Sequence, residues 1–171
     1  MLLGLGFSWL GDILLLFEEK HALFFATGLA SFLVAHLSYA VSFGRYAKRQ
    51  GGGDMPNLLI SLGLLAVGIM VYVLLLPALG ALRVPVALYV LAILAMSLTA
   101  RQVQEQQKGA AGRLLFGGAL LFMLSDSLLA TAKFLGDFPL SGLLVMLSYV
   151  LAQTLLTAGT RRLVVRKNSD P

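Results

Sequence analysis

The sequence predicts an all-α integral membrane protein, built as a polytopic bundle of six transmembrane helices. Hydrophobic residues make up 58% of the chain and charged residues only 12%, and the mean hydropathy is +0.88. These values lie outside the range of ordinary globular domains and inside that of membrane proteins. Six apolar runs, most of them near the length that spans a bilayer, supply the helices. They cover residues 1–17, 22–43, 57–79, 84–98, 114–134 and 139–159.

The first run contains an acidic residue, Asp12, and still favours insertion. Its ten Leu, Ile and Phe residues contribute roughly 3 to 6 kcal/mol, at about 0.3 to 0.6 kcal/mol each, which offsets the cost of one Asp. No basic segment precedes this run and no small-residue cleavage pattern follows it. We therefore expect a helix rather than a removed signal peptide.

We expect the other five runs to be helices as well, because lipid offers no hydrogen-bond partner to free backbone N–H and C=O groups. Polar stretches at 44–56 and 99–113 separate the second run from the third and the fourth from the fifth, and neither could hold a soluble domain. The Gly51-Gly52-Gly53-Asp54 segment lacks the lysine and the strand-to-helix context of a phosphate-binding loop, so we expect a flexible turn. The whole chain is then one membrane domain, with a disordered tail over 164–171.

Basic residues are divided unevenly between the two sides of this threading. Ten lie on one side: Arg45, Lys48, Arg49, Arg101, Lys108, Arg113, Arg161, Arg162, Arg166 and Lys167. Three lie on the other: Lys20, Arg83 and Lys133. The positive-inside rule predicts a multi-pass protein with both termini cytoplasmic, in the inner membrane if the source is bacterial. Anionic lipid headgroups account for the net charge of +5 more simply than nucleic acid, so we expect no nucleic-acid partner.

Several kinds of chemistry are excluded by the residue counts. The chain has no cysteine, which excludes disulfides, thiolate nucleophiles and cysteine metal sites. With two histidines a three-histidine zinc site is impossible, and His36, Asp12 and Asp126 alone make a poor ligand set, so we expect no metal and no cofactor. A Ser-His-Asp triad could be assembled on paper from Ser125 or Ser127, but no nucleophile-elbow pattern supports it.

Two carboxyl groups inside apolar runs are the first candidates for chemistry. Asp12 lies in Gly11-Asp12-Ile13-Leu14-Leu15 and Asp126 in Ser125-Asp126-Ser127-Leu128-Leu129. An Asp at the centre of a spanning helix costs roughly 2.5 to 3.5 kcal/mol, so such residues normally face a protein interior or a wet cavity. In a shared low-dielectric pocket, burial and mutual repulsion favour one protonated and one charged carboxyl, which supplies an acid and a base near neutral pH.

Other polar residues fall at a similar depth. At 1.5 Å per residue, Asp12, Asp126, Tyr149 and His36 lie roughly 7 to 18 Å below the non-cytoplasmic boundary, so one site could contain them all. Helical spacing places three further pairs on common faces: His36 with Tyr39, Tyr149 with Gln153, and Ser8 with Asp12. The alternative is that these groups and Ser125 only form polar contacts that hold helices together.

An internal repeat is also suggested by the two acidic helices. The helix with Asp12 is followed by Leu37-Ser38-Tyr39 and the helix with Asp126 by Leu147-Ser148-Tyr149. Both acidic helices run in the same direction, which indicates a parallel repeat. If the repeated unit has four helices, the last four helices form the second unit and the first two form half of the first unit. The chain is then a shortened 4+4 repeat that lacks the first two helices of its first unit.

Four motifs in sequence order resemble the YhhN/TMEM86 family of membrane proteins over essentially the whole chain. They are Ser8-x-x-Gly11-Asp12, then Gly28-x-x-x-Phe32-x-x-x-His36-x-x-Tyr39, then Ser125-Asp126-Ser127-Leu128-Leu129-Ala130, then Tyr149-x-x-Ala152-Gln153. The resemblance implies eight helices, of which this chain would lack the first two, through a shortened chain or a start assigned too far downstream. It also implies lysoplasmalogenase activity, the hydrolysis of a lysolipid vinyl ether to a fatty aldehyde and a glycerophospho-alcohol.

The implied reaction needs a general acid, an ionised partner and a water molecule. Asp12 and Asp126 would form the acid and base as a coupled pair, without an assignment of which one donates the proton. Supporting residues would orient the water, tune the acid or bind the headgroup: Ser8, His36, Tyr39, Ser125, Tyr149 and Gln153. The lipid substrate would enter from the bilayer between helices.

Two other functions compete with this one. In a small proton-coupled transporter or channel, the Asp pair would carry protons, and a polar path to both faces would be expected. The polar residues lie mainly towards one half of the membrane, which favours the hydrolase. A non-catalytic membrane scaffold would tolerate replacement of Asp12 and Asp126 by Asn.

Overall fold

A computed structural model describes residues 1–51, 57–107 and 109–169, which form α-helices joined by short connections. Most of the predicted flexible turn, residues 52–54, lies outside the described residues. The elements in chain order are α1 (Leu2–Leu15), α2 (Ala22–Arg49), α3 (Leu58–Leu75), the short 3-10 helix η1 (Gly80–Leu82), α4 (Arg83–Gln106), α5 (Ala110–Leu135) and α6 (Ser141–Ser169). The predicted helical membrane bundle is thus confirmed. Among the described residues, α2 to α6 are long and apolar enough to cross a membrane, and α1 is a shorter apolar helix.

Local signals set several helix ends. Asn57 caps α3, because its side-chain oxygen accepts hydrogen bonds from the backbone N–H of Leu59 at 3.0 Å and of Ile60 at 3.4 Å. Gly136 ends α5 with a φ of 112°, a conformation that side chains disfavour. The start of α3 and the end of α5 therefore lie close to the boundaries predicted from the apolar runs.

Three helices continue past their predicted ends. α2 extends to Arg49 and α4 to Gln106, because hydropathy marks only the apolar part of a helix, whereas Arg, Lys and Gln extend it readily in water. α6 extends to Ser169, where we had expected a disordered tail from residue 164. Leu163 is 6% exposed and holds this part of α6 against the bundle, which explains the difference. Residues 170–171 lie outside the described part of the chain.

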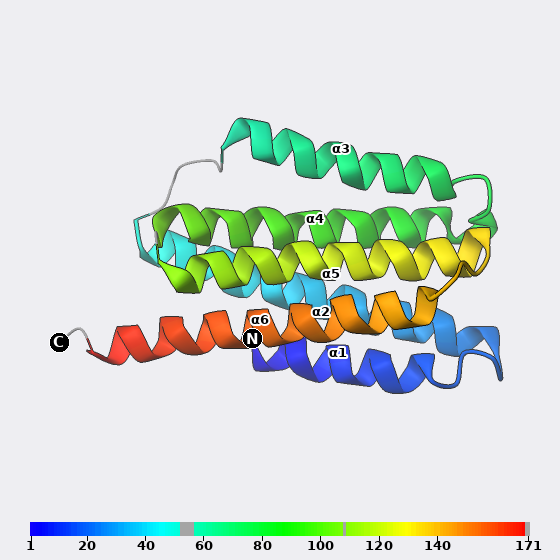
Figure 1. Cartoon of the computed structure of the whole chain (residues 1–171), viewed down its shortest axis with the longest axis horizontal. Coiled ribbons are helices and arrows are strands. Elements are labelled where there is room, and N and C mark those ends of the chain that lie inside the picture. The colour runs from blue at the N-terminus through cyan, green and yellow to red at the C-terminus, as the bar shows by residue number, and fades with distance from the viewer. Residues whose placement is uncertain (52–56, 108, 170–171) are drawn as a thin grey trace.

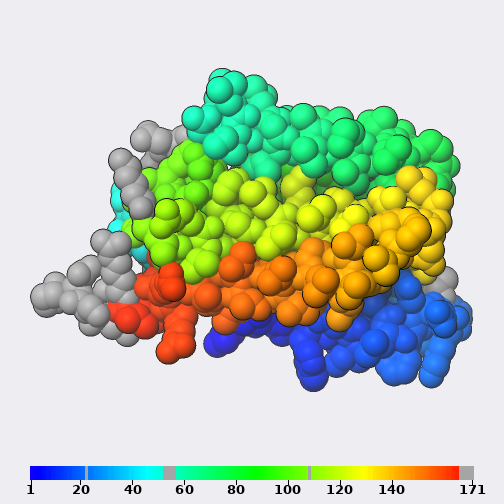
Figure 2. All heavy atoms as spheres, viewed as in Figure 1, coloured from blue at the N-terminus to red at the C-terminus, as the bar shows by residue number. Residues whose placement is uncertain are grey.

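The helices form one layered bundle in which consecutive helices run in opposite directions (Figure 1). α5 packs along α6, α1 along α2, and α2 and α5 both along α4, while α3 contacts mainly α4. Figure 2 shows α3 as a ridge at one edge of the molecule and α1 at the opposite edge. We call the end that holds residues 16–21, 76–82 and 136–140 the distal end, and the other the proximal end.

Small residues allow the closest helix contacts. A Cβ added to Gly118 of α5 would lie 3.0 Å from the Ala152 carbonyl oxygen of α6, and one added to Gly11 of α1 would lie 2.6 Å from the Phe32 ring of α2. Close approach of small residues is the usual way in which membrane helices pack, because lipid provides no hydrophobic driving force between them. The glycines therefore place α1 against α2 and α5 against α6, the two hairpins that carry Asp12 and Asp126.

Candidate active site

The carboxyl group of Asp126 is held by two other helices. Its Oδ2 is hydrogen-bonded to His36 Nε2 of α2 at 2.9 Å, and it accepts a hydrogen bond from the Tyr89 hydroxyl of α4 at 2.7 Å. His36 is fully buried and Tyr89 is 8% exposed, whereas the Asp126 side chain keeps 12% of its surface accessible. Hydrogen bonds of this kind offset the cost of burying a carboxyl group.

The carboxyl group of Asp12 belongs to a second hydrogen-bonded chain. The Tyr149 hydroxyl of α6 donates to Asp12 Oδ2 at 2.7 Å, and Gln153 Nε2 donates to the Tyr149 oxygen at 3.2 Å. The Tyr39 hydroxyl of α2 donates to Gln153 Oε1 at 3.1 Å. These residues form one network that joins α1, α6 and α2; it contains the predicted Tyr149–Gln153 pair, whereas His36 belongs to the Asp126 cluster.

Aromatic rings bring the two carboxyl clusters together. The ring of Phe122 on α5 lies 4.6 Å from His36 and 5.4 Å from Tyr149, measured between centroids, in edge-to-face contacts. Phe32 completes the cluster, at 5.9 Å from Tyr149. Phe122 thus contacts one member of each carboxyl cluster, His36 and Tyr149. The structure thus joins the residues that sequence analysis had placed at a similar depth.

The two hairpins exchange partners across this site. Asp12 of the α1–α2 hairpin is bound by Tyr149 of the α5–α6 hairpin, and Asp126 of the α5–α6 hairpin is bound by His36 of the α1–α2 hairpin. Such an exchange suits a parallel repeat, although the repeat itself stays a prediction.

The two predicted serines have different surroundings: Ser125 joins two helices, and Ser8 lies beside the site network. The Ser125 hydroxyl donates to the Val145 carbonyl of α6 at 3.1 Å, so it serves the α5–α6 contact. Ser8 is buried on α1 beside Tyr39. Ser127, the other serine considered for a Ser-His-Asp triad, donates to the Met123 carbonyl at 2.7 Å. Neither Ser125 nor Ser127 is therefore placed as a nucleophile activated by His36.

Tyr89 is the site residue that sequence analysis missed. It lies in the fourth apolar run, where a lone tyrosine is an ordinary packing or interface residue. Its depth was the available signal, because it follows the start of α4 by only six residues, which is about 9 Å along the helix. That depth falls inside the range predicted for the carboxyl groups.

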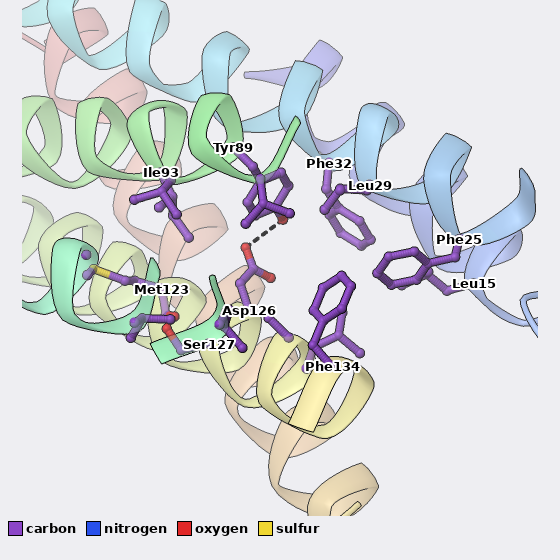
Figure 3. Close-up of a pocket in the computed structure, with 17 residues that line it drawn as sticks. Leu15, Phe25, Leu29, Phe32, Tyr89, Ile93, Met123, Asp126, Ser127 and Phe134 are labelled. Carbon is purple, nitrogen blue, oxygen red and sulfur yellow. Dashed lines mark hydrogen bonds between the residues drawn. The ribbon is translucent and has the colours of Figure 1, made fainter. Parts of the chain in front are cut away.

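An apolar cavity opens beside Asp126 (Figure 3). It is a small cavity that lies between α2, α3, α4 and α5, with Leu15 at its distal end. Phe25, Leu29 and Phe134 line it on one side of the carboxyl group, and Ile93 and Met123 on the other. Apart from Asp126, Tyr89 and Ser127, its lining is apolar, and an apolar lining with few, localised polar groups is typical of small-ligand sites.

Asp126 lines this cavity, but Asp12 does not. The pocket expected to hold both carboxyl groups is therefore not this cavity. Asp12 is instead bound by Tyr149, whose ring packs against Phe122. The reason is the packing of α1, which contacts α2 and lies at the edge of the bundle away from α3. A ligand in the cavity would contact Asp126 directly.

Comparison with known proteins identifies related sequences. The chain matches the YhhN family over residues 1–160. It is 36% identical to lysoplasmalogenase TMEM86A of Bos taurus and 34% identical to that of Homo sapiens, in each case over 90% of this chain and 61% of the relative. It is 34% identical to human lysoplasmalogenase TMEM86B over 94% of this chain and 62% of the relative. The chain therefore spans about three fifths of the length of these relatives. No solved structure matches.

Proposed function

This chain belongs to the YhhN family, and we propose that it is a membrane hydrolase that cleaves the vinyl ether bond of a lysoplasmalogen-type lysolipid. Its curated relatives bear the name lysoplasmalogenase. The structural observation that carries the proposal is a carboxyl group, Asp126, bound by His36 and Tyr89 in the wall of an otherwise apolar cavity. A hydrocarbon ligand with one reactive polar group suits this arrangement better than a hydrated ion path does.

Vinyl ether hydrolysis begins with transfer of a proton to the alkene carbon that is not bonded to oxygen. The carbon bonded to oxygen then becomes an oxocarbenium centre, water adds to it and loses a proton, and the resulting hemiacetal collapses to a fatty aldehyde and a glycerophospho-alcohol. One water molecule is consumed, and the proton supplied at the start is recovered from that water. The site must therefore provide an acid, a base and stabilisation of the cationic centre.

We assign the acid role to Asp126 because it is the carboxyl group that lines the cavity. Both of its hydrogen bonds fall on Oδ2, which leaves Oδ1 to face the reacting carbon. The same two bonds would stabilise the carboxylate that forms when the proton leaves. His36 and Tyr89 are therefore positioning residues in this mechanism.

Asp12 takes the role of the ionised partner. It is the remaining carboxyl group of the pair once Asp126 is assigned as the acid, and its Oδ2 accepts a hydrogen bond from the Tyr149 hydroxyl. Its negative charge would favour the cationic oxocarbenium centre at longer range, and the Asp126 carboxylate, which lines the cavity, would accept the proton lost by the attacking water. Gln153 and Tyr39 hold Tyr149 in place through the hydrogen-bonded chain described above.

The orientation predicted from the basic residues completes the proposal. Both termini would be cytoplasmic, and the distal end would face the opposite side. Asp126, nine residues from the end of α5, would then lie about 14 Å below the distal end of the bundle.

The decisive test compares two lipids with the purified protein in detergent. One is a lysoplasmalogen and the other is the analogue whose vinyl ether is saturated. We expect free aldehyde from the first alone, because only the alkene carbon can accept the proton. Release of a cleavage product from the saturated ether, or no release from either lipid, would contradict the proposed reaction.

A further inference from the structure

A second hollow, which we call the α3–α5 groove, runs along the surface between these two helices. Gly63, Val67 and Met70 of α3 form one wall, and Phe116, Leu120 and Leu124 of α5 form the other. Val67, Met70, Leu120 and Leu124 are exposed, so the groove opens to the surroundings of the bundle. It exists because α3 packs mainly against α4 and leaves its α5 side largely uncovered.

The α3–α5 groove adjoins the cavity beside Asp126. Val71, Met123 and Ser127 line both hollows. From Asp126 to Phe116 the groove follows α5 for ten residues, about 15 Å at 1.5 Å per residue. An apolar track therefore leads from the exposed side of the bundle to the carboxyl group.

In the opposite direction, α5 leads from Asp126 to a charged site at the distal end. Lys133 follows Asp126 by seven residues, about 10 Å along the helix. Its ammonium group lies 4.8 Å from the centre of the Phe25 ring and 3.1 Å from Glu18. Phe25 in turn lines the cavity, so the cation stands at the cavity's distal rim. The track thus has a hydrocarbon end, a carboxyl group in the middle and the Lys133–Glu18 ion pair at its distal end.

We propose that a single-chain lipid lies along α5, with its tail in the α3–α5 groove, its vinyl ether at Asp126 and its phosphate towards Lys133. This inference rests on the proposed function and adds the placement of the substrate. The reverse placement is disfavoured, because a long tail directed to the distal end would meet the Lys133–Glu18 pair after roughly 10 Å. The groove instead lets the tail enter sideways, without drawing hydrocarbon through water.

Gly63 offers a way to block the α3–α5 groove without disturbing the bundle. A Cβ added there would meet no atom within 4 Å, so a larger side chain can project into the groove. Gly63 lies eight residues from Val71, where the groove joins the cavity, which is about 12 Å along α3. Gly63→Phe should therefore obstruct a long tail and leave room for a short one. Gly142→Phe is the matched control, since Gly142 is equally open but lies on α6, outside the groove.

The first experiment measures kcat/KM for lysoplasmalogens with octenyl and octadecenyl tails. In Gly63→Phe we expect the long-to-short ratio of kcat/KM to fall at least tenfold, with the short substrate little affected. In Gly142→Phe the ratio should match that of the parent protein. An unchanged ratio in Gly63→Phe, or an equal loss for both tails, would overturn the placement of the tail.

The second experiment does not depend on turnover. A lysolipid with a saturated ether and a photoreactive diazirine at the tail end is bound to the protein, irradiated and mapped by mass spectrometry. We expect cross-links on α3 and α5 near Gly63 and Phe116, and their loss in Gly63→Phe but not in Gly142→Phe. Cross-links spread evenly over α1, α3 and α6 would indicate ordinary lipid contact and would overturn the site.

The two experiments together separate this inference from the proposed function. Cross-links confined to the α3–α5 groove in a protein that releases no aldehyde would support a lipid site and contradict the hydrolase. Aldehyde release combined with scattered cross-links would support the hydrolase and overturn the placement of its substrate.

Discussion

The Tyr149 hydroxyl of α6 donates a hydrogen bond to Asp12 of α1 at 2.7 Å, so the first and last helices of the chain are joined by a polar contact inside the bundle. The contact joins two hairpins, because Asp12 belongs to the α1–α2 hairpin and Tyr149 to the α5–α6 hairpin. Asp126 is bound in the same crosswise manner by His36. In a medium without water, a carboxyl group that lacks such a donor is strongly disfavoured, so these contacts also align the two hairpins.

Replacement of Asp126 by Asn should abolish aldehyde release. Asn keeps the size of the side chain but cannot donate a carboxylic acid proton, and loss of a general acid commonly lowers kcat by roughly 10²- to 10⁴-fold. The measurement is kcat with lysoplasmalogen, together with a thermal unfolding curve. Asp137→Asn is the control, because Asp137 is exposed in the α5–α6 connection. Retained activity in a folded Asp126→Asn variant would remove Asp126 from the mechanism.

Tyr89→Phe should slow the reaction without abolishing it. The change removes one of the two hydrogen bonds to Asp126 Oδ2 and leaves that of His36. A hydrogen bond to a charged group contributes about 1.5 to 3 kcal/mol, so kcat should fall roughly 10- to 100-fold if the bond matters in the transition state. The pH profile should also shift, which a purely structural role would not cause. Tyr72→Phe is the control, since the Tyr72 hydroxyl donates to the Arg83 carbonyl outside the site.

The pH profile of kcat should be bell-shaped. At low pH the ionised partner becomes protonated, and at high pH the general acid loses its proton, so activity falls on both sides. The low-pH limb belongs to the base of the reaction and the high-pH limb to the acid, so each Asn variant should change the profile. A profile that stays flat from about pH 4 to 9 would exclude this acid and base pair.

The Tyr149 and Asp12 side chains should be energetically coupled. A double-mutant cycle with Tyr149→Phe and Asp12→Asn isolates their interaction, which we expect to contribute about 0.5 to 3 kcal/mol to the free energy of unfolding. The measurement is reversible unfolding in detergent. The same cycle with Tyr46→Phe in place of Tyr149→Phe should show no coupling, because Tyr46 lies near the proximal end of α2, away from Asp12. Additive effects in the first cycle would contradict the contact.

Neighbouring glycines of α5 should respond differently to a methyl group. In Gly118→Ala the new Cβ would lie 2.9 Å from the Leu156 side chain and 3.0 Å from the Ala152 carbonyl, so α5 and α6 must separate. We expect a loss of about 1 to 3 kcal/mol in the free energy of unfolding. In Gly117→Ala the closest atom is at 3.7 Å, an ordinary contact, and the better helix propensity of Ala should leave stability equal or higher. Equal losses in both variants would argue against close packing at Gly118.

Sequence analysis found most of the site for a definite reason. A carboxyl group in an apolar run carries a large insertion cost, so Asp12 and Asp126 stand out without any structure. The pairing of Tyr149 with Gln153 on one face follows from helical spacing alone. Tyr89 escaped notice because a tyrosine hydroxyl in an apolar run costs far less than a charge. Ser125 was included because it belongs to one of the four motifs that carry the family resemblance, but adjacent residues point to different faces of a helix.

The sequence by itself determined that this protein crosses a membrane as a bundle of helices, because apolar composition and the backbone's need for hydrogen bonds depend only on which residues are present. The tertiary structure decided which side chains meet: Asp126 with His36 and Tyr89, and Asp12 with Tyr149. It also decided that only Asp126 lines the cavity. The physical reason is that lipid-facing and buried faces are both apolar in this chain, so hydrophobic periodicity cannot report how each helix is rotated, and packing at small residues sets that rotation.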